Sequence, residues 1–491
     1  MMEPGIAGAW ELLRQARDVF HDDAAALAVV ADLQDRLEGP LRIAVAGMVK
    51  AGKSTLLNAI IGEEIAPTDA GECTRVVTWY RYGHTPKITL YPFTGGPRTL
   101  PVTREDGRLV FSLGDVQAGV VERLVVDWPA ASLRDLTLID TPGIASLSQD
   151  VSGRSTAFLL PEDAPMAADA VIYLMRHLHA SDVRFLESFK DTAAGQSGTV
   201  NALAVLSRAD EIGAGRIDSL ISAAVIADRY SRDQSLRPLA LGVVPVAGLL
   251  AQSSRTMRQS DVEAMKQLAQ MDKNHRERLM LSADRFVRVA GPEGLDQDMK
   301  ASLVQRFGLF GIRLAVALIR GGTTDPTELA HELARRSGLG RLLDTIEYLF
   351  QTRADALKAR AAVVGLQSLL GVAPTGRTAS LEAALERLQT GAHEFRELKL
   401  LAALRTGGIG IGPEQTAEAE RLVGGRGSTV ALRLGLEPDA SAGHISEAAR
   451  DCLNRWRLIA ENPLTDPSGL EACRVVIRSC EGMLAAMPAV R

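Results

Sequence analysis

The sequence predicts an α/β domain followed by an all-helical region. Between residue 41 and about residue 250, short apolar segments alternate with glycine-rich or polar loops and with helical patterns, which is typical of a largely parallel sheet covered on both faces. After that point the strand patterns end, and apolar residues recur at helical spacing. A chain of 491 residues is too long for one hydrophobic core, so we expect two or three domains.

Three regions follow from the order of these patterns. Residues 1–39 carry apolar positions at helical spacing up to a Gly-Pro break, and they predict one N-terminal helix. Residues 40–335 contain all the strand patterns, with extra strands between 76 and 128 that suggest an antiparallel edge, and a helical insertion at about 255–300. Residues 336–491 are expected to be helical. Single helices are predicted over 255–287, 300–320 and 336–371.

The composition limits the classes of partner and compartment. A formal net charge of -5 gives no general attraction to nucleic acid, so we expect no nucleic-acid partner. The four cysteines form no CxxC pair, which favours a reducing, cytoplasmic setting. The longest apolar runs fall short of the roughly 20 residues that a membrane-spanning helix needs, so any membrane contact is expected to be peripheral.

A glycine-rich loop follows the first predicted strand, with a helix-forming sequence after it. Four residues fit the phosphate-binding pattern GxxxxGK[ST]: Gly47, Gly52, Lys53 and Ser54. Backbone N–H groups of the loop and of the helix start, from Ala51 to Thr55, are expected to hold phosphates. Lys53 would reach the β- and γ-phosphates, and Ser54 would bind Mg²⁺.

Two further segments supply groups that a nucleotide-bound Mg²⁺ requires. Asp140 ends an apolar strand in "LTLIDTPG" and is expected to hold Mg²⁺ through water, while the Gly143 N–H senses the γ-phosphate. Between this motif and the glycine-rich loop, a threonine should close over Mg²⁺ and the γ-phosphate. Thr74 is the predicted residue because an edge strand begins just after it, and Thr78 is the alternative.

Two later strand ends carry candidate base-binding residues. The segment "ALAVLSRAD" delivers Ser207, Arg208 and Asp210 where GTPases have NKxD or TKxD. Asp210 would accept two hydrogen bonds from guanine, and Arg208 would lie over the base. In "VVPVAG", Ala247 would donate its backbone N–H to the guanine oxygen. Four motifs in this order predict a site for GTP or GDP with Mg²⁺ at the carboxyl edge of the sheet.

The order of domains and the motifs resemble the bacterial dynamin-like proteins. Three segments look like the isoniazid-inducible (Ini) proteins of mycobacteria, and the length is closer to the shorter IniC type: "AGMVKAGKSTLLNAIIGEEIAPTDAGECTRVVTWYRYG", "LSRADEIGAGRIDSL" and "VVPVAGLLAQ". The resemblance implies a P-loop GTPase with a dynamin-type G domain over 40–335, a helical neck that includes 1–39, and a neck and trunk bundle over 336–491. It also implies that pairing of G domains couples GTP hydrolysis to membrane remodelling, in an envelope-stress or drug-tolerance response.

Three residues are predicted to act in hydrolysis. Lys53 would hold the phosphates, and Thr74 would help to place the attacking water. Lys50 occupies the loop position at which guanylate-binding proteins and atlastins carry an internal arginine finger, so it is a candidate for the cation that stabilises the transition state. The alternative is a solvated lysine on the outside of the loop.

The sequence leaves two roles open for the whole chain. In the first, it forms a homodimer through its G domains and touches the inner face of the membrane, for which residues 363–374 and 406–412 are the candidate segments. Both segments carry little basic charge, and a buried helix end and a glycine hinge are the alternative interpretations. In the second role, the chain is a regulatory nucleotide-binding subunit that acts through a longer dynamin-like paralogue.

Overall fold

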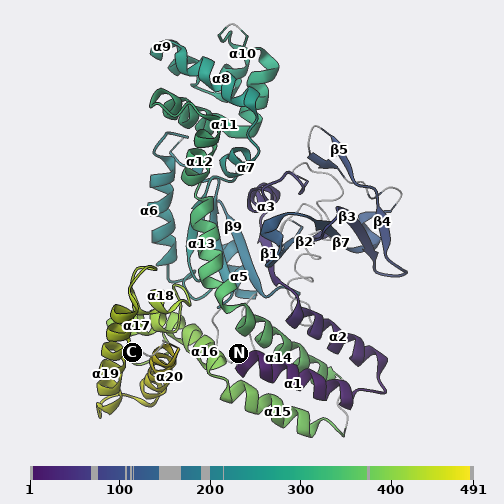
Figure 1. Ribbon diagram of the computed structural model, residues 1–491, viewed down its shortest axis with the longest axis vertical. Coiled ribbons are helices and arrows are strands. Elements are labelled where there is room, and N and C mark those ends of the chain that lie inside the picture. The colour runs from purple at the N-terminus through teal and green to yellow at the C-terminus, as the bar shows by residue number, and fades with distance from the viewer. Residues whose placement is uncertain are drawn as a thin grey trace.

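A mixed sheet of nine strands, counted over the described residues, lies at the centre of the computed structural model (Figure 1). The structure describes residues 4–67, 76–105, 108–110, 113, 116–142, 167–188, 200–213, 215–292, 294–372 and 376–486. The strand order is β11-β10-β9-β1-β8-β2-β7-β3-β4. The strands are β1 (Leu41–Gly47), β2 (Val77–Tyr82), β3 (Lys87–Pro92), β4 (Arg98–Leu100), β7 (Val121–Trp128), β8 (Leu136–Asp140), β9 (Ala170–Met175), β10 (Ala202–Ser207) and β11 (Val243–Val246), and a separate hairpin contains β5 (Thr103–Glu105) and β6 (Arg108–Val110).

One half of the sheet is parallel and buried on both faces. β1 pairs in parallel with β8 and β9, and the parallel pairing continues through β10 to β11. Ile43 and Val45 of β1 pack in a cluster with α3 (Lys53–Ile61) and α13 (Leu339–Leu349). Ala44 and Ala46 pack in a second cluster with α5 (Ala180–Ser188) and α6 (Ser219–Ser231). Successive side chains of a strand point to opposite faces, so the uninterrupted apolar run predicts this double cover.

The other half of the sheet contains the predicted antiparallel edge. β2 pairs antiparallel with β8, and β3 pairs antiparallel with β7 and β4. β2 and β7 are nevertheless parallel neighbours, so this half is mixed. The predicted α/β class is confirmed, and the residues after β11 are helical throughout the described part of the chain.

Two predictions of a single long helix are wrong, because a local break divides each of these regions into two helices. The N-terminal region has two helices, α1 (Pro4–Val19) and α2 (Ala24–Glu38), since the Asp23 side chain accepts hydrogen bonds from the Ala25 and Ala26 N–H groups and starts a new helix. The predicted helix over 336–371 is divided into α13 and α14 (Ala354–Val372) by a short 3₁₀ turn at Gln351–Arg353.

The region predicted as one charged helix over 255–287 also contains breaks. α8 (Gln259–Gln270), α9 (Lys273–Leu279) and α10 (Ala283–Arg288) replace it, with Asp272 capping α9 and Ser282 capping α10. These helices pack around α11 (Gln297–Arg320), next to α7 (Gly248–Arg255) and α12 (Pro326–Arg336). The apolar helix predicted over 300–320 is also interrupted, because Gly308 has the non-helical angles φ 62° and ψ 172°. Among the described residues, α11 alone is long and apolar enough to cross a membrane, and 56% of its apolar window is buried inside the protein.

The two segments considered for membrane contact each combine packed and exposed residues. Over residues 363–372, α14 buries Val363, Leu366 and Leu370 against α1, α2 and α15 (Ala379–Gly391), while Gln367, Gly371 and Val372 are exposed. In the segment 406–412, Gly407 ends α16 (His393–Thr406) in the left-handed conformation, and the two isoleucines are half-buried. The first segment is therefore a helix with a buried inner face and an exposed end, so the interpretation as a buried helix end is wrong for Gly371 and Val372.

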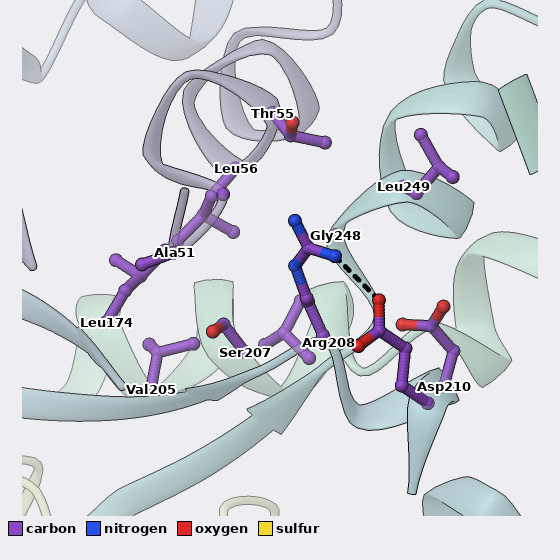
Figure 2. A pocket seen from close by; sticks show the side chains of 13 residues that line it. Ala51, Thr55, Leu56, Leu174, Val205, Ser207, Arg208, Asp210, Gly248 and Leu249 are labelled. Atoms are coloured by element: carbon purple, nitrogen blue, oxygen red, sulfur yellow. Dashed lines mark hydrogen bonds and ion pairs between the residues drawn. The ribbon is translucent and has the colours of Figure 1, made fainter. Parts of the chain in front are cut away.

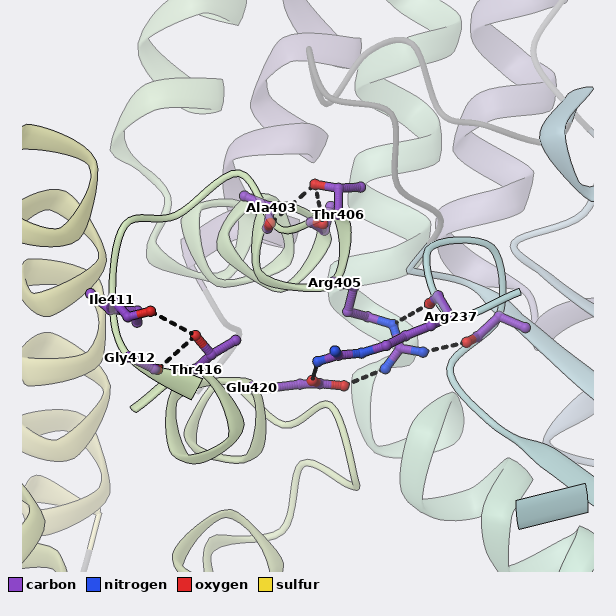
Figure 3. A network of polar contacts seen from close by, with 10 residues as sticks. Arg237, Ala403, Arg405, Thr406, Ile411, Gly412, Thr416 and Glu420 are labelled. Atoms are coloured by element: carbon purple, nitrogen blue, oxygen red, sulfur yellow. Dashed lines mark hydrogen bonds and ion pairs between the residues drawn. The ribbon is translucent and has the colours of Figure 1, made fainter. Parts of the chain in front are cut away.

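Hydrogen bonds and ion pairs connect the C-terminal helices to the α/β domain. Arg405 of α16 donates to the backbone oxygens of Arg237 (2.9 Å) and Ala240, which lie between α6 and β11. Its guanidinium also pairs with Glu420 of α17 (Pro413–Leu422), and Arg237 Nη2 lies 2.9 Å from the same carboxylate (Figure 3). The remaining helices of this bundle are α18 (Val430–Leu434), α19 (Ala442–Glu461) and α20 (Pro467–Ala485). One buried arginine thus joins two bundle helices to the sheet domain.

A buried ion pair attaches the N-terminal helices to the sheet. Arg36 Nε lies 2.7 Å from Asp169 Oδ1, and both side chains are buried.

We expect Arg36→Ala to lower the free energy of unfolding by about 3–5 kcal/mol, because it leaves the Asp169 carboxylate buried without its cation. Urea unfolding measures this change. Arg14→Ala is the control, since the exposed Arg14–Glu11 pair should contribute less than about 1 kcal/mol; equal effects of both variants would contradict the assignment.

A second prediction concerns acid stability. Burial alone would raise the pKa of Glu397 in α16, but the His393 ring, the Arg433 guanidinium and the Ser479 hydroxyl together lower this pKa to about 2. A lowered carboxyl pKa stabilises the fold above the ordinary pKa, and this stabilisation is lost as the pH falls toward 2. We expect the free energy of unfolding of Glu397→Gln to fall less steeply than that of the wild type between about pH 4.5 and pH 2. Parallel slopes in a urea and pH series would disprove this.

Candidate functional site

The glycine-rich loop runs from the end of β1 to the start of α3 and requires two glycines. Gly47 has φ 148°, and a Cβ there would lie 2.5 Å from the backbone oxygen of Leu174 in β9. Gly52 has φ 95° and precedes the first residue of α3. The loop therefore passes close over the sheet edge and presents the N-terminus of α3, where backbone N–H groups lack partners within the helix.

Lys53, Ser54 and Asp140 lie together at this helix start. Lys53 Nζ donates to the backbone oxygens of Gly47 (3.2 Å) and Met48 (3.5 Å), so the side chain lies back over the loop. Ser54 Oγ donates to Asp140 Oδ2 over 3.2 Å. The parallel pairing of β1 with β8 produces this meeting, because Asp140 is the residue in register with Val45.

The electrostatics of this cluster suit a hydrated Mg²⁺ ion. Burial raises the pKa of Asp140 to about 6, against the opposing effects of the Lys53 charge and the Ser54 hydroxyl. Burial also lowers the pKa of Lys53. Asp140 Oδ1 is buried and has no hydrogen-bond partner within the described part of the chain. The Ser54 hydroxyl and the Asp140 carboxylate, of which one oxygen is unpartnered, are hard oxygen donors of the kind that Mg²⁺ binds, directly or through water.

A cavity of about 160 Å³ opens beside the loop, between the ends of three strands (Figure 2). Its walls come from the start of α3, the segments after β10 and β11, and the end of β9. The predicted residues among the lining are Ala51, Gly52, Thr55, Ser207, Arg208 and Asp210. The cavity thus connects the loop to the segment that sequence reasoning assigned to the base.

Arg208 bridges this cavity. Its Nη1 lies 2.7 Å from Glu211 Oε1, and its Nη2 donates to the backbone oxygen of Lys50 over 3.2 Å. Glu211 also pairs with Arg176 at 2.6 Å. Arg208 (φ 51°) and Lys50 (φ 63°) are the only non-glycine residues with positive φ in the described ranges. Two strained residues joined by a hydrogen bond fix the distance between the glycine-rich loop and the base-binding segment.

Asp210 and Ser207 have different positions in the cavity wall. Burial raises the pKa of Asp210, against the opposing charge of Arg208. A half-buried carboxylate of this kind is suited to accept hydrogen bonds from a planar N–H pair. Ser207 donates its hydroxyl to the backbone oxygen of Met175 (3.2 Å), so it supports β10 against β9 rather than offering a free group.

The assignment of Ala247 is corrected by its hydrogen bond. Its N–H donates to the backbone oxygen of Ser337 over 2.9 Å, in the turn between α12 and α13, and the residue is fully buried. Gly248 lines the cavity instead and begins α7, where its N–H has no partner within the helix. Sequence reasoning missed Gly248 and Glu211, although each stands directly beside a predicted residue.

The remaining predicted residues fall into two groups. Thr74 and Gly143 lie outside the described residues. Thr78 is buried in β2, and its hydroxyl contacts the Val76 backbone oxygen at 3.4 Å, as expected of a strand residue. Lys50 contributes its backbone to the site, while its side chain is exposed and is not among the residues that line the cavity.

Comparison with known proteins agrees with these motifs. The model of the dynamin family matches residues 43–194. The isoniazid-induced protein IniC of Mycobacterium tuberculosis is 42% identical over 456 residues, covering 93% of this chain and 92% of that protein. IniA of the same species is 34% identical over 148 residues, 28% of this chain and 22% of that protein.

More distant relatives share parts of the chain. A bacterial dynamin-like protein of Nostoc punctiforme is 31% identical over 119 residues, 22% of this chain and 17% of that protein. A solved chain of an oligomerised bacterial dynamin pair is 13% identical and covers 98% of this chain and 74% of its own length, with a TM-score of 0.32, a similarity too low to add to the fold assignment. Identity of 42% over almost the full length of both proteins is decisive: this chain belongs to the dynamin family, as a member of its isoniazid-induced IniC branch with a dynamin-type GTPase domain.

Proposed function

We propose that this protein binds GTP with Mg²⁺ and hydrolyses it. One observation carries the proposal: the Lys53, Ser54 and Asp140 cluster lies at the start of α3, and the cavity lined by Gly52 and Thr55 of the same helix start is also lined by Asp210. The phosphates would lie on the N-terminus of α3, and guanine would lie between Arg208 and Gly248, with Asp210 at its edge. Ser54 and Asp140 would hold Mg²⁺, which when bound neutralises charge on the β- and γ-phosphates.

The chain's own residues would divide the work of hydrolysis. Lys53 has to move from the loop oxygens to the phosphates, so nucleotide binding exchanges two hydrogen bonds to neutral backbone oxygens for contacts with anionic oxygens. Thr74 remains the proposed residue that closes over the γ-phosphate and places the water, and Gly143 the proposed γ-phosphate sensor. The reaction is in-line attack of water on the γ-phosphate, with release of GDP and phosphate.

The membrane role has two candidate forms. In the first, paired G domains couple hydrolysis to remodelling of the inner face of the cytoplasmic membrane. In the second, the chain is a regulatory nucleotide-binding subunit for a longer paralogue, and the partial similarity to IniA makes such a protein a reasonable partner. Val363, Leu366 and Leu370 of α14 are buried and, among the described large apolar side chains of this segment, only Val372 is exposed, so the small apolar area offered to lipid favours the second form. Co-sedimentation with anionic liposomes, with and without the paralogue, separates the two forms.

Asp210→Asn tests guanine recognition. An amide in place of the carboxylate loses one of two acceptors and gains a donor, which suits the carbonyl of xanthine. We expect GTP affinity to fall by ~10²-fold or more and xanthosine triphosphate to become the preferred nucleotide. Fluorescent nucleotide titration measures both affinities. Asp218→Asn, on an exposed aspartate, is the control. Unchanged GTP affinity in Asp210→Asn would overturn the base assignment.

Lys50→Ala tests the proposed internal cation. The left-handed backbone of Lys50 and its bond to Arg208 set the direction of a solvent-exposed side chain. We expect turnover of GTP to fall by up to ~10³-fold while nucleotide affinity changes little, because the charge acts on the transition state. Lys50→Arg should keep most of the activity, and Lys399→Ala is a control on an exposed helical lysine. A normal turnover in Lys50→Ala would leave Lys50 as a solvated loop residue.

A further inference from the structure

A second cavity, of about 450 Å³, opens on the side of α6 and α9 and is separate from the nucleotide site. It lies where the start of α6 meets α9 and α11. We call it the α6–α11 groove and define it by Ile217, Met280, Leu281, Arg276, Arg313 and Arg320, which line it. Its volume is in the range of cavities that receive a ligand or a protruding peptide segment.

The rim of the α6–α11 groove is unusually apolar for a surface. Leu281 is 67% exposed and Ile217 is 57% exposed. Ile221 and Val225 continue the apolar stripe along the outer side of α6, at 72% and 68% exposure. Ile221 and Val225 are spaced by four and therefore share one face of α6, while Ile217 precedes this helix in the turn that leads into it. Exposed apolar side chains that lie near one another mark an interaction surface.

The floor of the groove is positively charged. The described hydrogen bonds of its arginines go to backbone oxygens: Arg276 to Met271 (2.8 Å), Arg313 to Gly215 and Met280 (2.6 Å each), and Arg320 to Ala269 (3.3 Å). Within the described residues, none of the three lies at ion-pair distance from a carboxylate. Glu277, which also lines the groove, pairs with Lys273. The groove therefore fits a segment with an apolar centre and acidic flanks.

The chain carries such a segment in the loop between α19 and α20. Leu464 is 91% exposed, the largest value for a large apolar side chain in the described part of the chain, and Leu458 is 68% exposed. Two exposed acidic residues, Glu461 and Asp466, flank Leu464 in sequence. We call Leu458, Glu461, Leu464 and Asp466 the α19–α20 knob.

The knob is held in one conformation by its own hydrogen bonds. The Leu464 N–H donates to Asn462 Oδ1 (3.0 Å), and Thr465 Oγ1 donates to the Ile459 backbone oxygen (2.8 Å). Asp466 accepts from the Gly469 N–H (2.6 Å) and caps α20. A fixed loop loses little conformational entropy on binding, which favours insertion into a partner.

We propose that the α19–α20 knob of one copy inserts into the α6–α11 groove of a second copy. Leu464 contacts Ile217 and Leu281 in the apolar part, and the two knob carboxylates face the groove arginines. The groove lies beside α9 and α11, at the top of Figure 1, and the knob belongs to the α19 and α20 hairpin at the lower left. Because the contact uses two different surfaces, every added copy leaves one groove and one knob unoccupied, and assembly proceeds head to tail.

Sedimentation velocity of the full chain without nucleotide tests this contact, so that its outcome does not depend on GTP chemistry. We expect the wild type to associate as its concentration rises. Leu281→Asp in the groove and Leu464→Ser in the knob should each weaken association by roughly 10- to 100-fold, because each removes one buried leucine from the contact. Val372→Ser, at a 70% exposed residue that ends α14, is the matched control and should associate like the wild type.

Mixing the two variants makes the test specific. Leu281→Asp keeps an intact knob and Leu464→Ser keeps an intact groove, so the mixture should restore association as 1:1 dimers that do not grow further. A monomeric wild type, single variants that associate like the wild type, or a mixture that stays monomeric would each overturn the proposal. Binding of Leu464 to phosphatidylglycerol liposomes without self-association would also overturn it and assign the knob to lipid. Thermal unfolding of both variants confirms that the exposed substitutions leave the fold intact.

Discussion

The parallel pairing of β1 with both β8 and β9 is the constraint on which the rest of the site depends. Parallel neighbours end at the same edge, so the glycine-rich loop, Asp140 and the end of β9 must meet there. The contact is close enough that Gly47 cannot carry a side chain beside Leu174. Every group that would touch phosphate or metal in the described part of the chain is positioned by this register.

The helical regions depend on the same sheet through buried cations that bind backbone oxygens. Lys358 of α14 donates to the carbonyls of Leu37 and Gly39 at the end of α2, just before β1 begins. Arg405 donates in the same way to the turn before β11. These hydrogen bonds constrain the orientation of each helix, because a carbonyl accepts a hydrogen bond only over a limited range of angles. Apolar packing adds to this constraint. The sheet therefore sets the positions of helices that are distant in sequence.

Local sequence predicts the glycine turns and the helix start of the glycine-rich loop, whereas the backbone partner of the Ala247 N–H lies far away in sequence and could not be predicted. Gly47, Gly52, Lys53 and Ser54 form a continuous motif, and its geometry follows from glycine freedom and a helix start. Ala247 was assigned from its neighbours alone, and nothing near it in sequence shows that Ser337 takes its N–H. The helix breaks were not predicted because the helical spacing of apolar residues continues on both sides of each break. A capping aspartate such as Asp23 ends one helix and starts the next without interrupting that spacing. The groove brings together Ile217, Met280 and Arg313, which are far apart in sequence, so no local pattern predicts it.

The hydrogen bond between Ala247 and Ser337 also determines where α13 contacts the sheet. Gly338, the next residue, has φ 83° and lies so close to β11 that a Cβ would be 2.3 Å from the Pro245 oxygen. The first turn of α13 therefore rests directly on the strand end that leads into the base cavity, and α13 continues through one 3₁₀ turn into α14, a helix of 19 residues that is about 28 Å long. A small rotation of α13 at this contact would therefore produce a larger displacement at the far end of α14, since displacement grows with distance from the point of rotation.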